Sequence, residues 1–126
     1  MRYKLIQRIN PNDIRSDRKW YAIPVNSGKT VTLDDLAKQV SGRSSLTRGD
    51  VNSALQNLVD ELPMFLLMGQ SVQLGELGTV RISFSSSGID DPAKFHTSMI
   101  RPVKIIFTPG WMMKKELDEI TFWIDK

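Results

Sequence analysis

Apolar and polar residues alternate along two stretches near the middle of the chain, on either side of two glycines. The first stretch covers residues 72–74 and the second covers residues 79–85. Alternation of this kind is typical of β-strands with one buried face. Gly75 and Gly78 lie between the stretches, and glycine adopts positive φ without a Cβ clash, so the chain can reverse there within a few residues. The pattern predicts two antiparallel strands joined by a glycine turn, with residues 100–107 as a returning strand.

A short helix is predicted over residues 32–42, where apolar residues recur at helical spacing. Thr32 can cap its first turn, and Asp34 and Asp35 favour the positive end of the helix dipole. Gly42 fits a left-handed residue that ends the helix. Local signals therefore define both ends of this element.

A longer helix is predicted over about 48–68, with Thr47 as its cap and Asp50 three residues later. Pro63 falls inside this segment, but the apolar period continues across it, so we expect one kinked helix rather than two. Residues 62–68 are apolar nearly all round. Such a segment in a short chain predicts burial in a partner subunit.

Both ends of the chain carry further candidates for strands. Residues 3–9 alternate imperfectly and residues 20–23 are rich in aromatic and β-branched side chains, which predicts a β-rich N-terminal extension over residues 1–31. The alternative for this extension is a disordered tail. The apolar and aromatic residues 120–124 are expected to dock against another element or to extend the edge of a sheet.

The segment between the last two predicted strands is polar and weakly patterned. We interpret residues 85–99 as the tip and return of a β-arm whose extremity is partly mobile. After the returning strand, Thr108 and Pro109 are expected to open a last helix, as its cap and its first residue. Its apolar residues predict that it continues to about Glu119.

The positive charge of the chain is concentrated near its N-terminus. The 126 residues carry a formal net charge of +3. Residues 1–31 hold seven basic and two acidic residues, a net charge of +5, whereas residues 32–69 carry −2 and residues 70–126 are neutral. An anionic partner would therefore be attracted most strongly to the N-terminal segment.

Composition limits the location and the chemistry that we expect. The sequence has no cysteine, and none of its apolar runs approaches the roughly 20 residues needed to span a bilayer. The start of the chain lacks the apolar run of a signal peptide. We therefore expect a cytoplasmic protein without a membrane partner.

No arrangement of residues favours an enzyme. Residues 28–30 resemble the end of a phosphate-binding loop, but such a loop has a glycine five residues before Gly28, and this chain has Ile23 there. A hairpin turn is therefore the better interpretation. His96 is the only histidine, which excludes a pair of histidine metal ligands. We expect no catalytic residue, no metal, no cofactor and no small-molecule substrate.

Two motifs, in this order and at this separation, carry a resemblance to a known family. They are Gly-Gln-Ser-Val-Gln-Leu-Gly-Glu-Leu-Gly-Thr-Val at 69–80 and Phe-Thr-Pro-Gly at 107–110. With the two helices before them, they resemble the HU/IHF family of bacterial histone-like DNA-binding proteins, over about 32–119. The N-terminal segment is similar to the added segment of longer HU-related variants.

The resemblance implies an α+β fold that forms an intertwined homodimer. A helical body, a three-stranded antiparallel sheet and a β-arm over about 83–102 would make up the HU-like domain at 32–119. The extension at 1–31 would precede this domain, and an aromatic tail at 120–126 would follow it. The implied activity is binding and bending of double-stranded DNA in the nucleoid, without sequence specificity.

The arm departs from the family pattern at its tip. Family members carry Arg-Asn-Pro there, and the proline wedges between bases, whereas this chain has Asp90, Asp91 and Pro92. Pro92 and Phe95 are the candidates for a wedge at a base step. The alternative function is therefore an HU-like scaffold with reduced DNA binding that acts as a protein-interaction or assembly module.

The candidate DNA contacts are the basic residues of the arm, of its flanks and of the N-terminus. They are Arg81, Lys94, Arg101, Lys104, Lys114, Arg2, Lys4 and Arg8. Such residues neutralise phosphates in a DNA complex. The alternative for each of them is a solvated surface charge.

Overall fold

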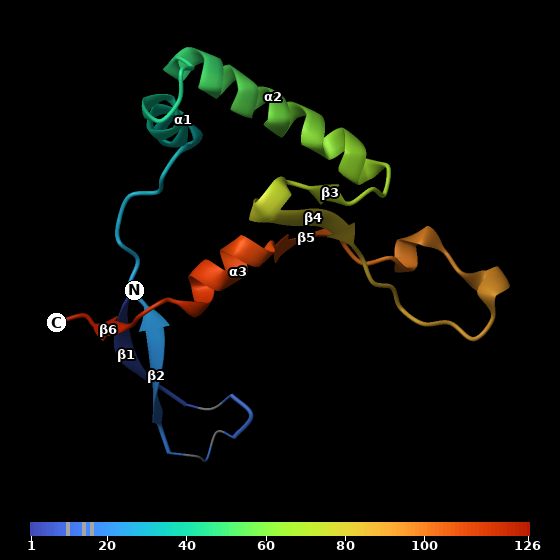
Figure 1. Ribbon diagram of the computed structural model, residues 1–126. Helices are drawn as coiled ribbons and strands as arrows, with labels where there is room; N and C mark the ends of the chain where they lie inside the picture. The colour runs from blue at the N-terminus through green and yellow to red at the C-terminus, as the bar shows by residue number, and fades with distance from the viewer. Residues whose placement is uncertain (10, 14, 16) are drawn as a thin grey trace. The chain divides into compact units, whose positions relative to one another are not determined.

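The chain folds as two units, and one of them combines segments from both ends of the sequence. One unit joins Met1–Thr30 to Glu116–Lys126, and the other consists of Val31–Lys115. The computed structural model describes all residues except 10, 14 and 16 (Figure 1). The turn residues at 10–13, Asn-Pro-Asn-Asp, are expected to end the first strand, and this turn lies partly outside the described residues.

Two helices begin the unit Val31–Lys115, and both start with the same local device. In α1 (Leu33–Gly42), the Thr32 hydroxyl accepts the Asp35 N–H at 3.2 Å while the Asp35 carboxylate accepts the Thr32 N–H at 3.0 Å. In α2 (Arg48–Leu67), Thr47 and Asp50 exchange the same two bonds at 3.1 and 3.3 Å. Each capping box satisfies donors that a helix start otherwise leaves free. Both predicted caps are confirmed.

The end of α1 differs from the prediction. Gly42 is the last residue of the helix and does not adopt positive φ, and Arg43 is the C-cap with φ of −108°. The Arg43 N–H donates to the Val40 carbonyl at 3.1 Å. This bond tightens the last turn, so no left-handed residue is required.

The second helix continues through its proline as one element, as expected. Pro63 lies inside α2, and the helix ends only at Leu67. Gly69 then takes φ of +81°, while the N–H of Gln70 donates to the Phe65 carbonyl at 3.1 Å. This is a Schellman ending, in which glycine supplies the left-handed residue after the helix.

A three-stranded antiparallel sheet follows, in the order β3-β4-β5. Its strands are β3 (Val72–Gln73), β4 (Gly78–Ser83) and β5 (Lys104–Pro109). The glycine turn is confirmed, because Gly75 and Gly78 both have positive φ, of +56° and +148°. A short 3-10 turn, η1 (Gly75–Leu77), fills the space between them, and α2 packs against β3 and β4.

The last helix starts later than predicted. Thr108 and Pro109 belong to β5, where they pair with Thr79 and Gly78, and α3 runs from Trp111 to Asp118. The ladder with β4 keeps these two residues extended, so they do not act as the cap and the first turn of the helix. The N–H of Lys114 donates to the Gly110 carbonyl at 2.9 Å, which places Gly110 at the cap position just before α3.

Residues 84–103, which include most of the predicted β-arm, form an irregular excursion between β4 and β5 (Figure 1). The β4–β5 ladder stops at the pair Ser83 and Lys104, and one isolated bridge, Ser86 to Ile100, follows it. Two 3-10 turns, η2 (Pro92–Lys94) and η3 (Thr97–Met99), lie between irregular segments. The strands expected to reach residue 85 and to begin at residue 100 are therefore shorter. Serines and glycine at 85–88 favour strands weakly, and proline at 102 has no N–H for a ladder.

The other unit is a small sheet built from both ends of the chain. Antiparallel strands β1 (Arg2–Arg8) and β2 (Lys19–Pro24) form its hairpin, which confirms the strands expected in the extension. Strand β6 (Trp123–Ile124) pairs with β1 in parallel, so the tail extends a sheet edge. The segment 28–30 is not a hairpin turn: it lies in the connection between β2 and α1, where Gly28 has φ of +105°.

The buried core is small. Among the described residues, the buried apolar side chains are Ala37, Val51, Leu66 and Val80. Large apolar side chains at the end of α2 remain open to solvent, and Leu67 and Met68 are 81% and 70% exposed. The unit Val31–Lys115 thus leaves apolar surface uncovered by its own residues.

Candidate nucleic-acid interface

Two of the predicted cations lie on one face of the sheet at the base of the excursion. Arg81 in β4 pairs with Ile106, and Lys104 in β5 pairs with Ser83. Paired and alternate residues of a ladder share a face, so Arg81 and Lys104 are diagonal neighbours at about 7–8 Å. Both side chains are exposed. The sheet therefore presents two adjacent positive charges near the end of β4 and the start of β5, beside the irregular segment that joins them.

Two more predicted cations belong to the excursion itself. Lys94 is the last residue of η2, and Arg101 is held by its backbone N–H, which donates to the Ser85 carbonyl at 2.8 Å. Both side chains are exposed. The bond from Arg101 holds the backbone in place just before β5 begins, so the point from which the Arg101 side chain extends is fixed.

Lys114 lies on α3 and is exposed. Its neighbour Lys115 is engaged differently, because the Lys115 ammonium lies 5.5 Å from the centre of the Trp111 ring. That distance fits a cation–π contact. Lys114 is therefore the α3 cation more readily available to an anionic partner.

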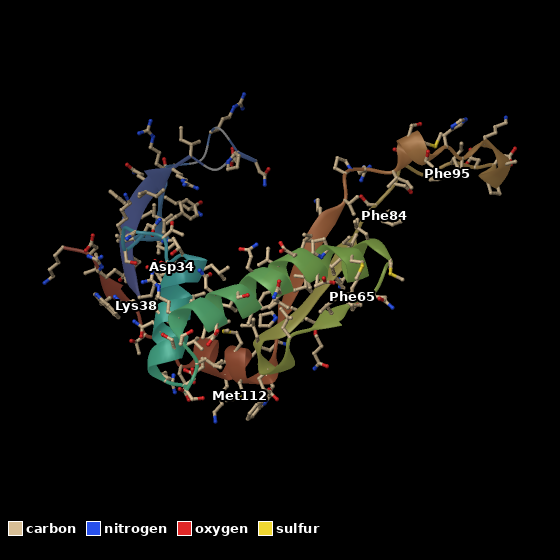
Figure 2. The ribbon with its side chains drawn as sticks, turned by 90° about the horizontal axis from the view of Figure 1, so that it is seen from above. Asp34, Lys38, Phe65, Phe84, Phe95 and Met112 are labelled. Atoms are coloured by element: carbon tan, nitrogen blue, oxygen red, sulfur yellow. The ribbon has the colours of Figure 1, made fainter. Side chains whose placement is uncertain are left out.

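The tip residues that depart from the family pattern have a local structural role. The Asp91 carboxylate accepts the Ala93 N–H at 3.0 Å and so caps η2. Pro92 is the first residue of that turn, and Phe95 directly follows it with its N–H donating to the Pro92 carbonyl at 3.2 Å. Both wedge candidates thus flank one turn, and Phe95 is exposed on the outer part of the excursion while Phe84 lies nearer its base (Figure 2).

The three N-terminal candidates share one face of β1. Arg2, Lys4 and Arg8 occupy even positions, whereas Tyr3, Leu5 and Gln7 occupy the odd positions of the same strand. Successive side chains of a strand point to opposite faces. All three cations therefore project from the same side of the small sheet, which we call the cationic face.

The ladder adds three residues to this face that sequence analysis did not select as a site. Lys19 pairs with Arg8, Tyr21 pairs with Ile6, and Trp123 pairs with Arg2. Alternation within residues 19–23 could have suggested the first two, but only the register assigns them to the face of Arg8. The parallel pairing of β6 has no local signal, so the place of Trp123 could not be predicted.

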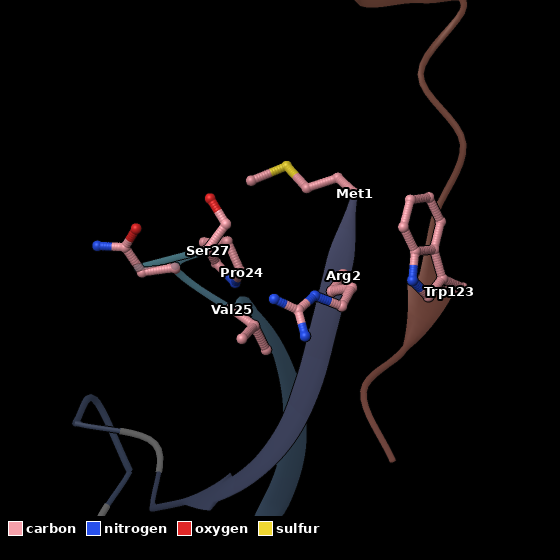
Figure 3. A pocket seen from close by; sticks show the side chains of 7 residues that line it. Met1, Arg2, Pro24, Val25, Ser27 and Trp123 are labelled. Carbon is pink, nitrogen blue, oxygen red and sulfur yellow. The ribbon is translucent and has the colours of Figure 1, made fainter. Parts of the chain in front are cut away.

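A pocket of about 520 Å³ opens at one end of the cationic face (Figure 3). Its lining includes the Arg2 guanidinium and the Trp123 indole, together with Asn26 and Ser27 from the segment after β2. Arg2 also contacts the Asp125 carboxylate at 3.3 Å, with nearly half of its side chain exposed. The pocket therefore combines a positive charge, an aromatic surface and small polar groups.

Metal clusters and membrane-spanning helices are both absent from the described part of the chain. Within the described residues, no group of three or more histidine, cysteine or acidic side chains is placed to hold a metal ion. None of the described helices combines the length and apolar character needed to cross a membrane. The eight predicted cations lie in both units: three are on the cationic face and five are in Val31–Lys115.

Comparison with known proteins gives a family and a structural neighbour. The chain resembles, with a TM-score of 0.61 and 11% sequence identity, the crystal structure of an inferred DNA-binding protein from Bacteroides vulgatus ATCC 8482. The likeness covers 98% of this chain and 46% of that chain, so the protein spans about half the length of this neighbour. Among curated proteins, none matches the sequence. The family model that matches residues 1–123 describes an HU domain fused to a winged helix-turn-helix, an Ig or a glycine-rich motif, and the chain therefore belongs to this family, HU-HIG.

Proposed function

We propose that this protein binds double-stranded DNA without sequence specificity and bends it as a homodimer, in the cytoplasm at the nucleoid. The observation that carries the proposal is the pair Arg81 and Lys104, which lie side by side on the sheet of an HU domain where the excursion begins. The structural neighbour, itself an inferred DNA-binding protein, supports the same partner. The proposed role is architectural, and it requires no catalytic step.

The uncovered apolar surface of Val31–Lys115 supports self-association. Phe65, Leu67 and Met68 at the end of α2 are all exposed, as are Ile105 and Phe107 on β5. Monomeric proteins rarely leave contiguous apolar surface of this kind in water. A second copy of the chain would bury it, and a symmetric dimer would place two excursions on one DNA duplex.

In the proposed complex, cations contact phosphates and the excursion approaches the minor groove. Arg81 and Lys104 would hold the duplex at the base, with Lys94, Arg101 and Lys114 as further phosphate contacts. Pro92 or Phe95 at the η2 turn would insert at a base step and open it, which bends the duplex. Arg2, Lys4 and Arg8 would add to the attraction of the anionic backbone.

The test measures binding and bending of a duplex labelled with fluorophores at its two ends. The double substitution Arg81→Gln and Lys104→Gln should weaken binding and reduce the slope of log K against log salt by about 0.9 for each lost phosphate contact. Lys38→Gln, which removes an exposed cation of α1, is the matched control. Equal salt slopes for the double variant and the control would overturn the assignment of these contacts.

The bending and the dimer have separate measurements. Energy transfer between the duplex ends should rise on binding, and Pro92→Ala combined with Phe95→Ala should reduce that rise while leaving most of the affinity. Light scattering should give the mass of a dimer at micromolar concentration. A monomer mass under those conditions would contradict the dimer.

A second function has one observation in its favour. Asp90 and Asp91 place two carboxylates at the tip of the excursion, where they would repel a phosphate backbone. A scaffold that binds a protein partner instead would tolerate them. Absence of duplex binding at low salt would favour this assembly role over DNA bending.

A further inference from the structure

The charged residues of β1 and β2 all lie on one of the two faces of the small sheet. In β1 and β2, the basic residues Arg2, Lys4, Arg8 and Lys19 all lie on the cationic face. The opposite face of these strands carries no charged residue. A largely apolar pocket of about 650 Å³ lies beside Tyr3, Leu5 and Ala22 of that face, and Arg2 also contributes to its lining. One side of the sheet is therefore suited to an anionic partner and the other is not.

One pair on the cationic face opposes the stability of the sheet itself. Arg8 and Lys19 lie directly opposite each other in the β1–β2 ladder, and like charges in that position destabilise a strand pair. Within the described part of the chain, neither side chain forms an ion pair with a carboxylate. An anion bound across the two strands would relieve this repulsion.

Aromatic side chains lie among these cations. Tyr21 is 41% exposed and Trp123 is 54% exposed, and the register places both on the cationic face. A tyrosine or tryptophan that keeps this much of its surface open can accept a flat ring on its face. The pocket beside Trp123 adds the Arg2 guanidinium and the polar groups of Asn26 and Ser27.

We propose that the cationic face binds single-stranded nucleic acid. Phosphates contact Lys4, Arg8 and Lys19, and bases stack on Tyr21 and Trp123, with one base entering the pocket beside Arg2. From Arg2 to Arg8 the strand extends about 20 Å, since each residue adds roughly 3.3 Å. Proteins that bind single strands combine positive charge along the backbone with aromatic platforms for the bases in this way. The inference shares with the proposed function the nucleic-acid nature of the partner and the cations Arg2, Lys4 and Arg8, but it does not depend on Arg81, on Lys104 or on DNA bending.

The test is the anisotropy of a fluorescein-labelled oligothymidylate, titrated with the full chain at two or more salt concentrations. Tyr21→Leu should weaken binding about tenfold through lost stacking, and Tyr21→Phe should restore it. Trp20→Leu is the matched control, because Trp20 is an exposed aromatic residue on the opposite face of the same strand. Equal losses for Tyr21→Leu and Trp20→Leu, with both proteins folded by circular dichroism, would overturn the inference.

The charges have their own measurement. The double substitution Arg8→Gln and Lys19→Gln should reduce the salt slope for the oligothymidylate by about 1.4, at roughly 0.7 for each cation on a single strand. Because the variant also removes a repulsive pair, its melting temperature should not fall. Lys38→Gln again serves as the control for charge alone. An unchanged slope for the double variant would contradict contact at this face.

The two proposals can fail independently. Arg81→Gln with Lys104→Gln should weaken binding of the duplex and leave binding of the oligothymidylate unchanged. If only duplex binding is absent, DNA bending is wrong and the single-strand surface stands. If the chain binds duplex but not the oligothymidylate, or if the Tyr21 and Arg8 variants affect only the duplex, the single-strand surface is wrong.

Discussion

The backbone N–H of Gly110 donates to the carbonyl of Leu77 at 3.0 Å, and this bond joins the two motifs that carry the family resemblance. The approach is so close that a Cβ on Gly110 would lie 2.8 Å from the Glu76 carbonyl carbon and nearer still to its oxygen. Glycine is thus required at the start of α3 for lack of space. The turn after β3 and the end of β5 form one packed corner.

We expect Gly110→Ala to destabilise the protein by at least the 1–3 kcal/mol that is typical of overpacking, because backbone rather than a flexible side chain occupies the space. Gly88→Ala is the control, since Gly88 has open space around it and φ outside the left-handed region. Denaturation with urea measures both. Similar unfolding free energies for the two variants would contradict the close packing at Gly110.

The start of α2 offers a second test. Thr47→Ala removes the hydroxyl that accepts the Asp50 N–H, and we expect a loss of about 1 kcal/mol in unfolding free energy. Thr47→Ser keeps the hydroxyl and should retain most of the stability. If serine and alanine destabilise equally, the lost methyl group rather than the cap is responsible.

The capping box of α1 predicts a dependence on pH. The pKa of Asp35 is lowered from its ordinary value of 3.8, first because its carboxylate accepts the backbone N–H of Thr32 and then because of the Thr32 hydroxyl. Ionised Asp35 therefore stabilises the folded state above pH 3.8, and this contribution is lost as the pH falls through the lowered value. The wild type should melt above Asp35→Asn at pH 7, and the difference should shrink by pH 3. A melting-temperature difference that grows as the pH falls would contradict a stabilising role for ionised Asp35.

Pro63 predicts a substitution that increases stability. Proline in a helix interior lacks the N–H for the preceding turn, and alanine is favoured over it by about 3 kcal/mol. Pro63 is exposed, so Pro63→Ala leaves no cavity and should raise the melting temperature. Asn57→Ala, at another exposed position of α2, reports the smaller gain from helix propensity alone. A lower melting temperature for Pro63→Ala would mean that packing of α2 depends on the shape that proline imposes.

Elements defined by neighbouring residues were predictable from the sequence. The caps at Thr32 and Thr47 and the turn at Gly75 and Gly78 depend on residues only three apart, and all were correct. One local prediction was wrong, because Gly42 does not adopt positive φ at the end of α1. Other errors occurred where distant partners decide the conformation. Pro109 was expected in a helix, but pairing with Gly78 keeps it in β5.

In the candidate sites, too, only the placements that depend on neighbouring residues were predictable from the sequence. The two-residue period of a strand is enough to group Arg2, Lys4 and Arg8 on one side of β1. The position of Lys19 opposite Arg8 requires the hairpin register, and the position of Trp123 requires a pairing between the two ends of the chain. The strands beside the arm were expected to reach residue 85 and to begin at residue 100, but their ladder stops at Ser83 and Lys104, because alternation along one strand does not show which cross-strand hydrogen bonds form.

The parallel pairing of β6 with β1 has a consequence for the order in which the protein folds. Arg2 and Trp123 are about 120 residues apart in the chain, and closing a loop of that length carries an entropic penalty that local hairpins avoid. We expect the β1–β2 hairpin and the Val31–Lys115 unit to form first, which shortens the loop that remains. Trp123 would then join the sheet in the last step. A nascent chain would already display Arg8, Lys19 and Tyr21, but only the finished protein would possess the pocket beside Arg2.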